Sequence, residues 1–133
     1  MSDDLAFLRA RIAEYKDYTE EAAVHDSDMR IRAYVGEALS AGQARLGNSL
    51  DDEMLKALDA TLLRCMFTDQ VFVRKFEHAD IAPAILTALV KNDRALVELA
   101  DRVATVAPGE FRALVRQIDD LFDLRRTPVP LTA

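Results

Sequence analysis

Three aspartates near the C-terminus have the spacing in this chain that is most suggestive of chemistry. Asp119 and Asp123 are four residues apart, so they share one face of a helix, and Asp120 lies beside them. Carboxylate oxygens are ligands that Mg²⁺ prefers, and several on one face can hold the ion against a diphosphate. A Mg²⁺-dependent enzyme that processes diphosphates is therefore one hypothesis for this chain.

The segment Asp119-Asp120-Leu121-Phe122-Asp123 resembles the DDxxD motif of class I terpene synthases and prenyltransferases over these five residues. The resemblance implies aspartates that hold Mg²⁺ on a diphosphate. Those enzymes are much longer and place a second acidic motif opposite the first. This sequence offers no such partner, because Asp51-Asp52-Glu53 is typical of a helix start. An amphipathic helix with acidic outer positions also produces this spacing, and we favour that interpretation.

Two further acidic pairs, Glu14/Asp17 and Glu98/Asp101, have the form Glu-x-x-Asp. They resemble the acidic motifs of all-α nucleotide pyrophosphatases of the MazG type, which implies Mg²⁺ held between adjacent helices. In that family the two motifs lie close together in sequence, whereas here more than eighty residues separate them. Solvated helix faces explain these pairs better than a metal site does.

Groups for nucleophilic chemistry are few. The only histidines are His25 and His78, and the Glu-x-x-His motif of di-iron bundles is absent. The single cysteine, Cys65, lies in an apolar run far from both histidines, so we interpret it as a small buried residue in a reducing compartment. Gly-rich phosphate loops and Gly-x-Ser-x-Gly motifs are also absent. We therefore expect no catalytic residue, no metal ligand and no cofactor.

Length and composition indicate one soluble domain. The chain has 133 residues, of which 50% are hydrophobic and 30% are charged. It contains only four Gly and four Pro, which is too few for the many turns of an all-β fold. Its formal net charge is −6, and its longest basic cluster is Arg125-Arg126, so we expect no nucleic-acid partner. A helix-turn-helix drawn across residues 98–116 would put Glu110 where an apolar residue must pack.

The N-terminus, Met-Ser-Asp-Asp, lacks the basic and apolar regions of a signal peptide. No apolar run approaches the roughly 20 residues that cross a bilayer. These two observations predict a cytoplasmic protein with no membrane partner.

Apolar residues at helical spacing predict an all-α fold, a compact bundle of five to seven helices. Residues 1–126 form the single domain, and 127–133 are a Pro-containing tail. We expect a first helix over 3–24, a turn with capping residues at 25–28, and a helix over 29–45 in which Gly42 permits a close crossing. Asn92-Asp93 is typical of a further cap, and the last helix spans 110–125, where Arg125 suits the negative end of the helix dipole.

The stretch 50–78 contains no Gly or Pro and is the expected centre of the bundle. Residues 51–66 have a strong helical pattern, and a break at Thr68-Asp69 favours two helices over one. Apolar residues surround this break on more than one side. We therefore predict that a pocket or interface, if the protein has one, involves Met66, Phe67, Val71, Phe72 and Phe76.

Together these observations favour a non-enzymatic interaction or regulatory protein that acts through a protein partner or as a homodimer. The motivation is a surplus of apolar residues outside the main helical stripes, namely Phe7, Tyr18, Phe67, Val71 and Val73. One alternative is a domain that binds a small apolar ligand in a pocket lined by Met54, Met66, Phe72 and Phe76. The other is the Mg²⁺ enzyme built on Asp119, Asp120 and Asp123.

Overall fold

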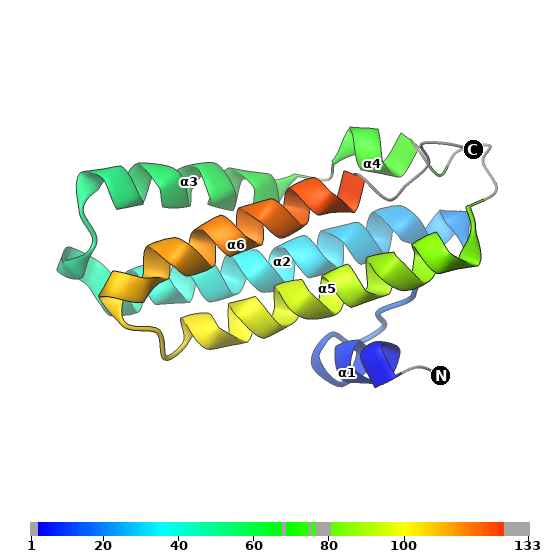
Figure 1. Cartoon of the computed structure of the whole chain (residues 1–133), viewed down its shortest axis with the longest axis horizontal. Helices are drawn as coiled ribbons and strands as arrows, with labels where there is room; N and C mark the ends of the chain where they lie inside the picture. The colour runs from blue at the N-terminus through cyan, green and yellow to red at the C-terminus, as the bar shows by residue number, and fades with distance from the viewer. Residues whose placement is uncertain (1–2, 68, 75, 77–80, 127–133) are drawn as a thin grey trace.

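The computed structural model describes residues 3–67, 69–74, 76 and 81–126 (Figure 1). Within these ranges the chain forms six α-helices and one 3₁₀ turn, and no strand. The elements are α1 (Asp3–Arg11), α2 (Glu21–Leu46), η1 (Gly47–Ser49), α3 (Asp52–Met66), α4 (Gln70–Arg74), α5 (Pro83–Val103) and α6 (Pro108–Arg126). The prediction of an all-α bundle of five to seven helices is confirmed, and the predicted tail 127–133 lies outside the described residues.

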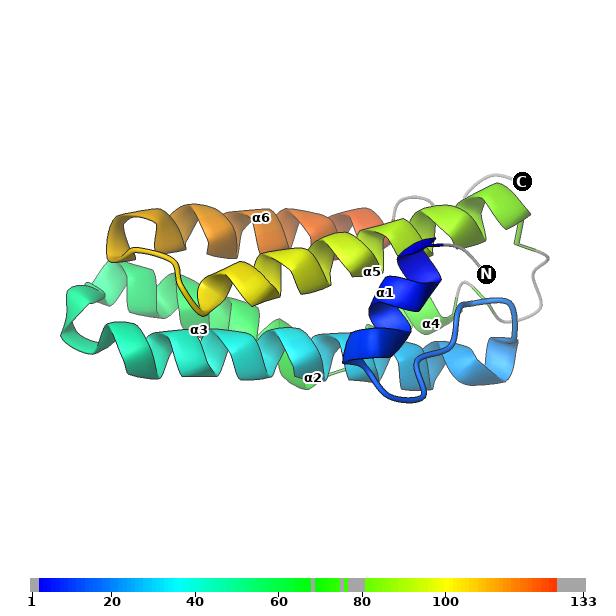
Figure 2. The same ribbon diagram turned by 90° about the horizontal axis from the view of Figure 1, so that it is seen from below.

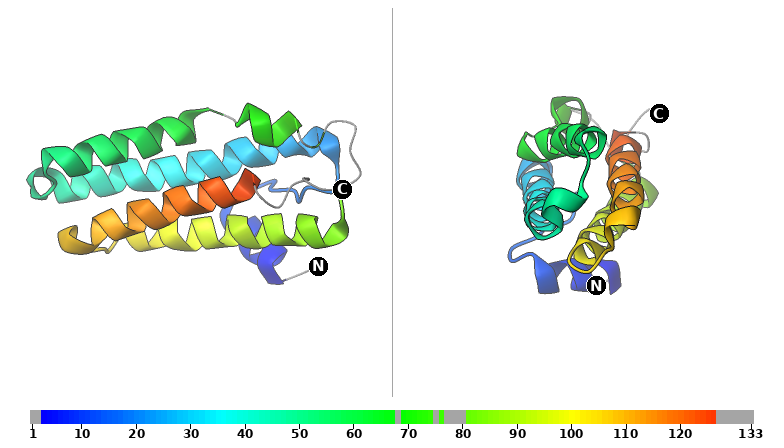
Figure 3. Two further views of the ribbon diagram at one scale, coloured as in Figure 1. Left: turned by 45° about the horizontal axis from the view of Figure 1, so that its top comes forward. Right: turned by 90° about the vertical axis from the view of Figure 1, so that its left-hand side faces the viewer.

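Four long helices lie side by side as two antiparallel hairpins, α2 with α3 and α5 with α6 (Figures 1 and 3). Helix α2 packs against both α3 and α5, so the two hairpins meet mainly along this helix. Helix α1 crosses the outside of the bundle and packs against α5 (Figure 2). Within the described ranges, no helix is both long and apolar enough to cross a membrane.

The core follows the helical stripes of the sequence. Large side chains from all four long helices are fully buried, among them Ile31, Val35, Leu39, Leu58, Leu89, Leu96, Phe111, Ile118 and Phe122. A Cβ added at Gly42 would clash with Val103 Cγ1 on α5. The predicted close crossing at Gly42 is thereby confirmed, and it brings α2 and α5 together.

The N-terminal boundaries differ from the prediction. Helix α1 ends at Arg11 instead of Val24, and Glu14 in the following connection has a left-handed backbone with φ of 62°. Helix α2 then begins at Glu21 and continues through the predicted turn at 25–28. Asp28 does not cap a helix there, because its buried carboxylate is bonded to Arg32 and Arg125 instead.

Two other helix ends also differ. The predicted cap at Asn92-Asp93 lies in the middle of α5, which runs unbroken from Pro83 to Val103. Asp93 is fully buried and bonds to Tyr15, in the connection between α1 and α2, and to Arg125 of α6, so it is not available to end this helix. Helix α6 begins at Pro108, two residues earlier than expected, because a proline fits the first turn of a helix.

The part of the stretch 50–78 that the structure describes forms two helices, as the sequence favoured. Asp51 caps α3 by accepting a hydrogen bond from the Met54 amide at 2.7 Å. Helix α3 ends at Met66, and α4 begins at Gln70. Asp69 caps α4 by accepting from the Phe72 amide at 3.2 Å, which confirms the predicted break.

Candidate functional site

The five residues predicted to form a pocket or interface divide into two groups. Met66 and Phe67, at the end of α3, are 66% and 62% exposed. Phe72 and Phe76 are buried members of the core. Val71 belongs to α4, and its side chain is outside the described set.

The buried pair packs around a tyrosine. The rings of Phe72 and Phe76 lie with their centroids 5.8 and 5.9 Å from that of Tyr18 and 5.3 Å from each other. Met54 lies twelve residues before Met66 on α3, which is about 18 Å along a helix. Met54, Met66, Phe72 and Phe76 therefore do not line one small cavity. Tyr18 is also buried, so it does not belong to the exposed surface that motivated the interaction hypothesis.

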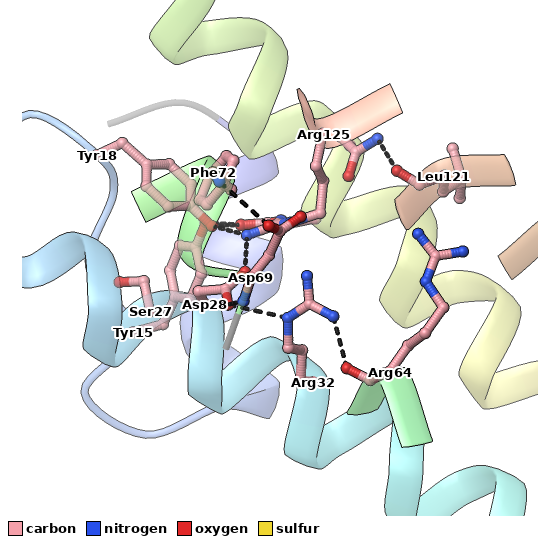
Figure 4. Close-up of polar contacts among 12 residues, drawn as sticks. Tyr15, Tyr18, Ser27, Asp28, Arg32, Arg64, Asp69, Phe72, Leu121 and Arg125 are labelled. Carbon is pink, nitrogen blue, oxygen red and sulfur yellow. Dashed lines mark hydrogen bonds and ion pairs between the residues drawn. The ribbon is translucent and has the colours of Figure 1, made fainter. Parts of the chain in front are cut away.

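A network of charged and tyrosine side chains fills the bundle interior beside these rings (Figure 4). Its centre is Arg125, which is fully buried near the end of α6. One terminal nitrogen of Arg125 donates to Asp28 Oδ1 at 2.7 Å and to the Tyr18 hydroxyl at 2.9 Å, and the other donates to Asp93 Oδ1. The hydroxyls of Tyr15 and Tyr18 both donate to Asp93 Oδ2, at 2.6 and 2.5 Å. We call Tyr15, Tyr18, Asp28, Arg32, Asp93 and Arg125 the charge network.

Arg32 extends the network to the end of α3. Its Nε donates to Asp28 Oδ2 at 2.8 Å, and its Nη1 donates to the Arg64 carbonyl at 2.6 Å (Figure 4). The Asp69 amide donates to the same Asp28 oxygen at 3.4 Å. The network thus contacts the chain on both sides of Met66 and Phe67.

The charges within the network balance. Asp28 and Asp93 supply two negative charges, and Arg32 and Arg125 supply two positive ones, which is how buried charges are tolerated in a protein interior. Burial alone would lower the pKa of Arg125, but the contacts with Tyr18 and Asp28 outweigh it and raise the pKa. Burial raises the pKa of Tyr15 and Tyr18, so both phenols stay protonated at neutral pH and act as donors.

Sequence reasoning missed this network, although a signal was present. Asp28 lies on the same stripe of α2 as Val24 and Ile31, which predicts burial for all three. Asp93 likewise falls between Leu89 and Leu96 on α5, and Arg125 follows Ile118 and Phe122 on α6. These three charged residues occupy inward positions on three different helices. Because a buried charge needs a counter-charge, this pattern predicts that they contact one another.

Large apolar side chains are exposed close to the network. Met29, Leu63, Met66 and Phe67 are 37%, 56%, 66% and 62% exposed, and we call these four residues the apolar patch. Only Leu124 joins them among the large apolar side chains that are exposed in the described part of the chain. Gly36 of α2 faces Cys65 of α3, and Asp28 reaches Asp69, so Met29 lies alongside the end of α3.

The candidate metal ligands have protein partners. Asp119 and Asp123 both bond to Arg64, at 3.3 and 2.8 Å, and Asp119 also accepts from Thr61. An arginine therefore lies where Mg²⁺ would have to bind, and Asp120 is exposed beside it. Burial raises the pKa of the Cys65 thiol to about 11, so little thiolate is present at neutral pH.

Each of the other acidic pairs also contributes to an ion pair on the surface. Glu14 pairs with Arg30 at 3.2 Å, and Asp101 pairs with Arg11 at 3.0 Å. The charge network is closed to any substrate by its burial, whereas the apolar patch is open to a partner. Comparison with protein-family models, with curated proteins and with solved structures finds no match for this chain.

Proposed function

We propose that the protein is a non-enzymatic interaction or regulatory protein that binds a protein partner, or a second copy of itself, through the apolar patch. The observation that carries the proposal is the exposure of Leu63, Met66 and Phe67 within five residues at the end of α3, with Met29 exposed on α2, the helix packed against it. Large apolar side chains gathered on one surface are typical of interaction sites. Methionines suit such a site because their flexible side chains adapt to different partners.

The polar groups of the chain support the same proposal. The buried charges neutralise one another, and Arg64 occupies the acidic face of α6. Asp119 and Asp123, two of the three candidate metal ligands, thus have structural partners. A binding function requires only the surface, and the network below keeps that surface in place.

Light scattering and partner capture test the proposal. We expect the wild-type chain to form a dimer at micromolar concentration, or to retain a specific protein from a lysate. The double variant Met66→Asp/Phe67→Asp should no longer form the dimer or retain the protein. Leu124→Asp is the matched control, because Leu124 is 51% exposed but lies on α6. A monomer that captures the same proteins with and without the double substitution would contradict the proposal.

A second candidate function is the binding of a small apolar ligand. A groove of about 450 Å³ between α2 and α3 is lined by Leu62, Cys65 and Met66 on one side, and its volume is in the range of ligand sites. A thermal-shift screen would distinguish this function, since a compound that binds here should raise the melting temperature of the wild type but not of Met66→Asp.

A further inference from the structure

The groove between α2 and α3 also has features that indicate what kind of partner fits it, provided that the proposed interaction function holds. Its floor on α2 consists of small residues, Ala33, Gly36 and Ser40. The backbones approach closely here, because a Cβ added at Gly36 would lie only 3.0 Å from Cys65 Cβ. Leu62 and Met66 form the wall on α3. A floor of small residues beside a bulky wall can accept large side chains from a partner.

The length of the groove suits a helix. From Ala33 to Ser40 the floor runs along seven residues of α2, which is about 10 Å, or two helical turns. Met29 and Phe67 are exposed at one end, and the apolar patch is continuous there with the groove. Amphipathic helices bind in grooves of this kind through apolar side chains spaced three and four residues apart.

The opposite end of the groove is acidic. Glu37 lines the groove from α2, and Asp59 lies on the same stripe of α3 as Leu62 and Met66. Both side chains are exposed, and neither forms an ion pair with any residue that the structure describes. Arg32 also borders the groove, but its charge is buried and neutralised by Asp28. Lys56 is exposed on the neighbouring stripe of α3, with Ala60 and Leu63.

We infer that this groove binds an amphipathic helix of another protein, with an apolar face over Leu62 and Met66 and a Lys or Arg beside Glu37 and Asp59. Two free carboxylates at one end of an apolar groove select a basic group and fix the direction of the bound helix. A second copy fits less well, because a chain of net charge −6 would be brought against an acidic rim.

A displayed library of helical peptides of about 14 residues, roughly four turns long, tests the inference. The peptides carry fixed leucines on one face and random residues elsewhere, and selection uses the intact wild-type protein. We expect enrichment of Lys and Arg near one end only. Glu37→Lys/Asp59→Lys should weaken the best peptide about tenfold or more in Kd and shift the selection to Asp and Glu. Asp120→Lys, an exposed change on α6, should do neither.

The outcomes separate this inference from the proposed function. Selected peptides without a charge preference, or an equal loss of affinity with Asp120→Lys, would overturn the basic helix while leaving the patch as a binding site. Binding only of a second copy, measured by light scattering, would also overturn it. If peptides were selected equally well by Met66→Asp/Phe67→Asp, the patch would not be the site, and the inference and the proposed function would both fail.

Discussion

The charge network and the apolar patch adjoin each other where α2 packs against the end of α3. Asp28 and Arg32 point into the bundle, while Met29 and Ala33, their neighbours in sequence, face the outside. Buried charges and exposed large apolar side chains are both departures from the usual arrangement of a soluble protein. Here the two departures adjoin each other, whereas the opposite end of the bundle is packed with ordinary core residues such as Leu39, Leu58 and Phe111.

The comparison suggests a division of roles. An apolar core would stabilise this end of the bundle at least as well, because buried ion pairs often contribute little net stability. A network with directional bonds does something that apolar packing does not, since it fixes the positions of specific backbone atoms. In this protein those atoms include the Arg64 carbonyl and the Asp69 amide, on either side of the exposed Met66 and Phe67.

Removal of the central cation should have the largest effect. Arg125→Ala leaves Asp93 buried without a counter-charge, so we expect a loss of about 3–5 kcal/mol in the free energy of unfolding. Arg125→Lys should be intermediate, because one ammonium cannot reach Asp28, Asp93 and Tyr18 as a planar guanidinium does. Urea denaturation measures both variants.

Arg116→Ala is the matched control for this substitution, because Arg116 is exposed on the same helix. Its effect should remain within about 0.5 kcal/mol. If Arg125→Ala and Arg116→Ala changed the free energy of unfolding equally, the buried network would contribute no more to stability than an exposed arginine does.

The sequence was sufficient to predict the fold class but not this site, for a physical reason. Helical periodicity reports burial, so it predicted α3, the break before α4 and the core stripes correctly. Asp28 and Asp93 were misplaced because a short carboxylate is as typical of a helix cap as of a buried ion pair. Whether each aspartate caps a helix or forms a buried ion pair depends on whether Arg125 reaches it. Arg125 is 97 positions from Asp28 and 32 positions from Asp93 in the sequence, so local patterns do not report these contacts.

Loss of the link between the two regions should have a smaller effect. Arg32→Lys keeps the charge but cannot hold Asp28 and the Arg64 carbonyl in the same geometry, so we expect about 1–2 kcal/mol of destabilisation. Amide hydrogen exchange should also become faster in the last turn of α3, which carries the patch. Arg112→Lys is the control, since Arg112 forms an exposed pair with Glu53. Unchanged exchange would mean that the network does not position the patch.

Alkaline pH should weaken the network progressively. Burial raises the pKa of Tyr15 and Tyr18 in the folded state, so above pH 10 the unfolded chain releases phenol protons that the folded chain keeps. Stability is therefore complete below pH 10 and falls as the pH rises, by roughly 1 kcal/mol per pH unit for each buried tyrosine.

Melting curves between pH 8 and 11.5 test this dependence. Tyr15→Phe should flatten the decline. Tyr34→Phe should flatten it by a similar amount over this range, because burial raises the pKa of the half-buried Tyr34 to about 12, which is above the highest pH used. A profile that is identical in all three proteins would show that the buried phenols do not titrate with unfolding.

We expect the smallest effect on stability at the apolar patch itself. Phe67 and Phe72 are five residues apart, but Phe67 is 62% exposed whereas Phe72 is fully buried. Phe72→Ala should cost about 3–5 kcal/mol, while Phe67→Ala should change the free energy of unfolding by less than about 0.5 kcal/mol. A residue that costs little to remove from the folded chain is not retained for packing. If Phe67→Ala instead destabilised the chain as much as Phe72→Ala, the patch would belong to the core, and the reason for assigning it a partner would be lost.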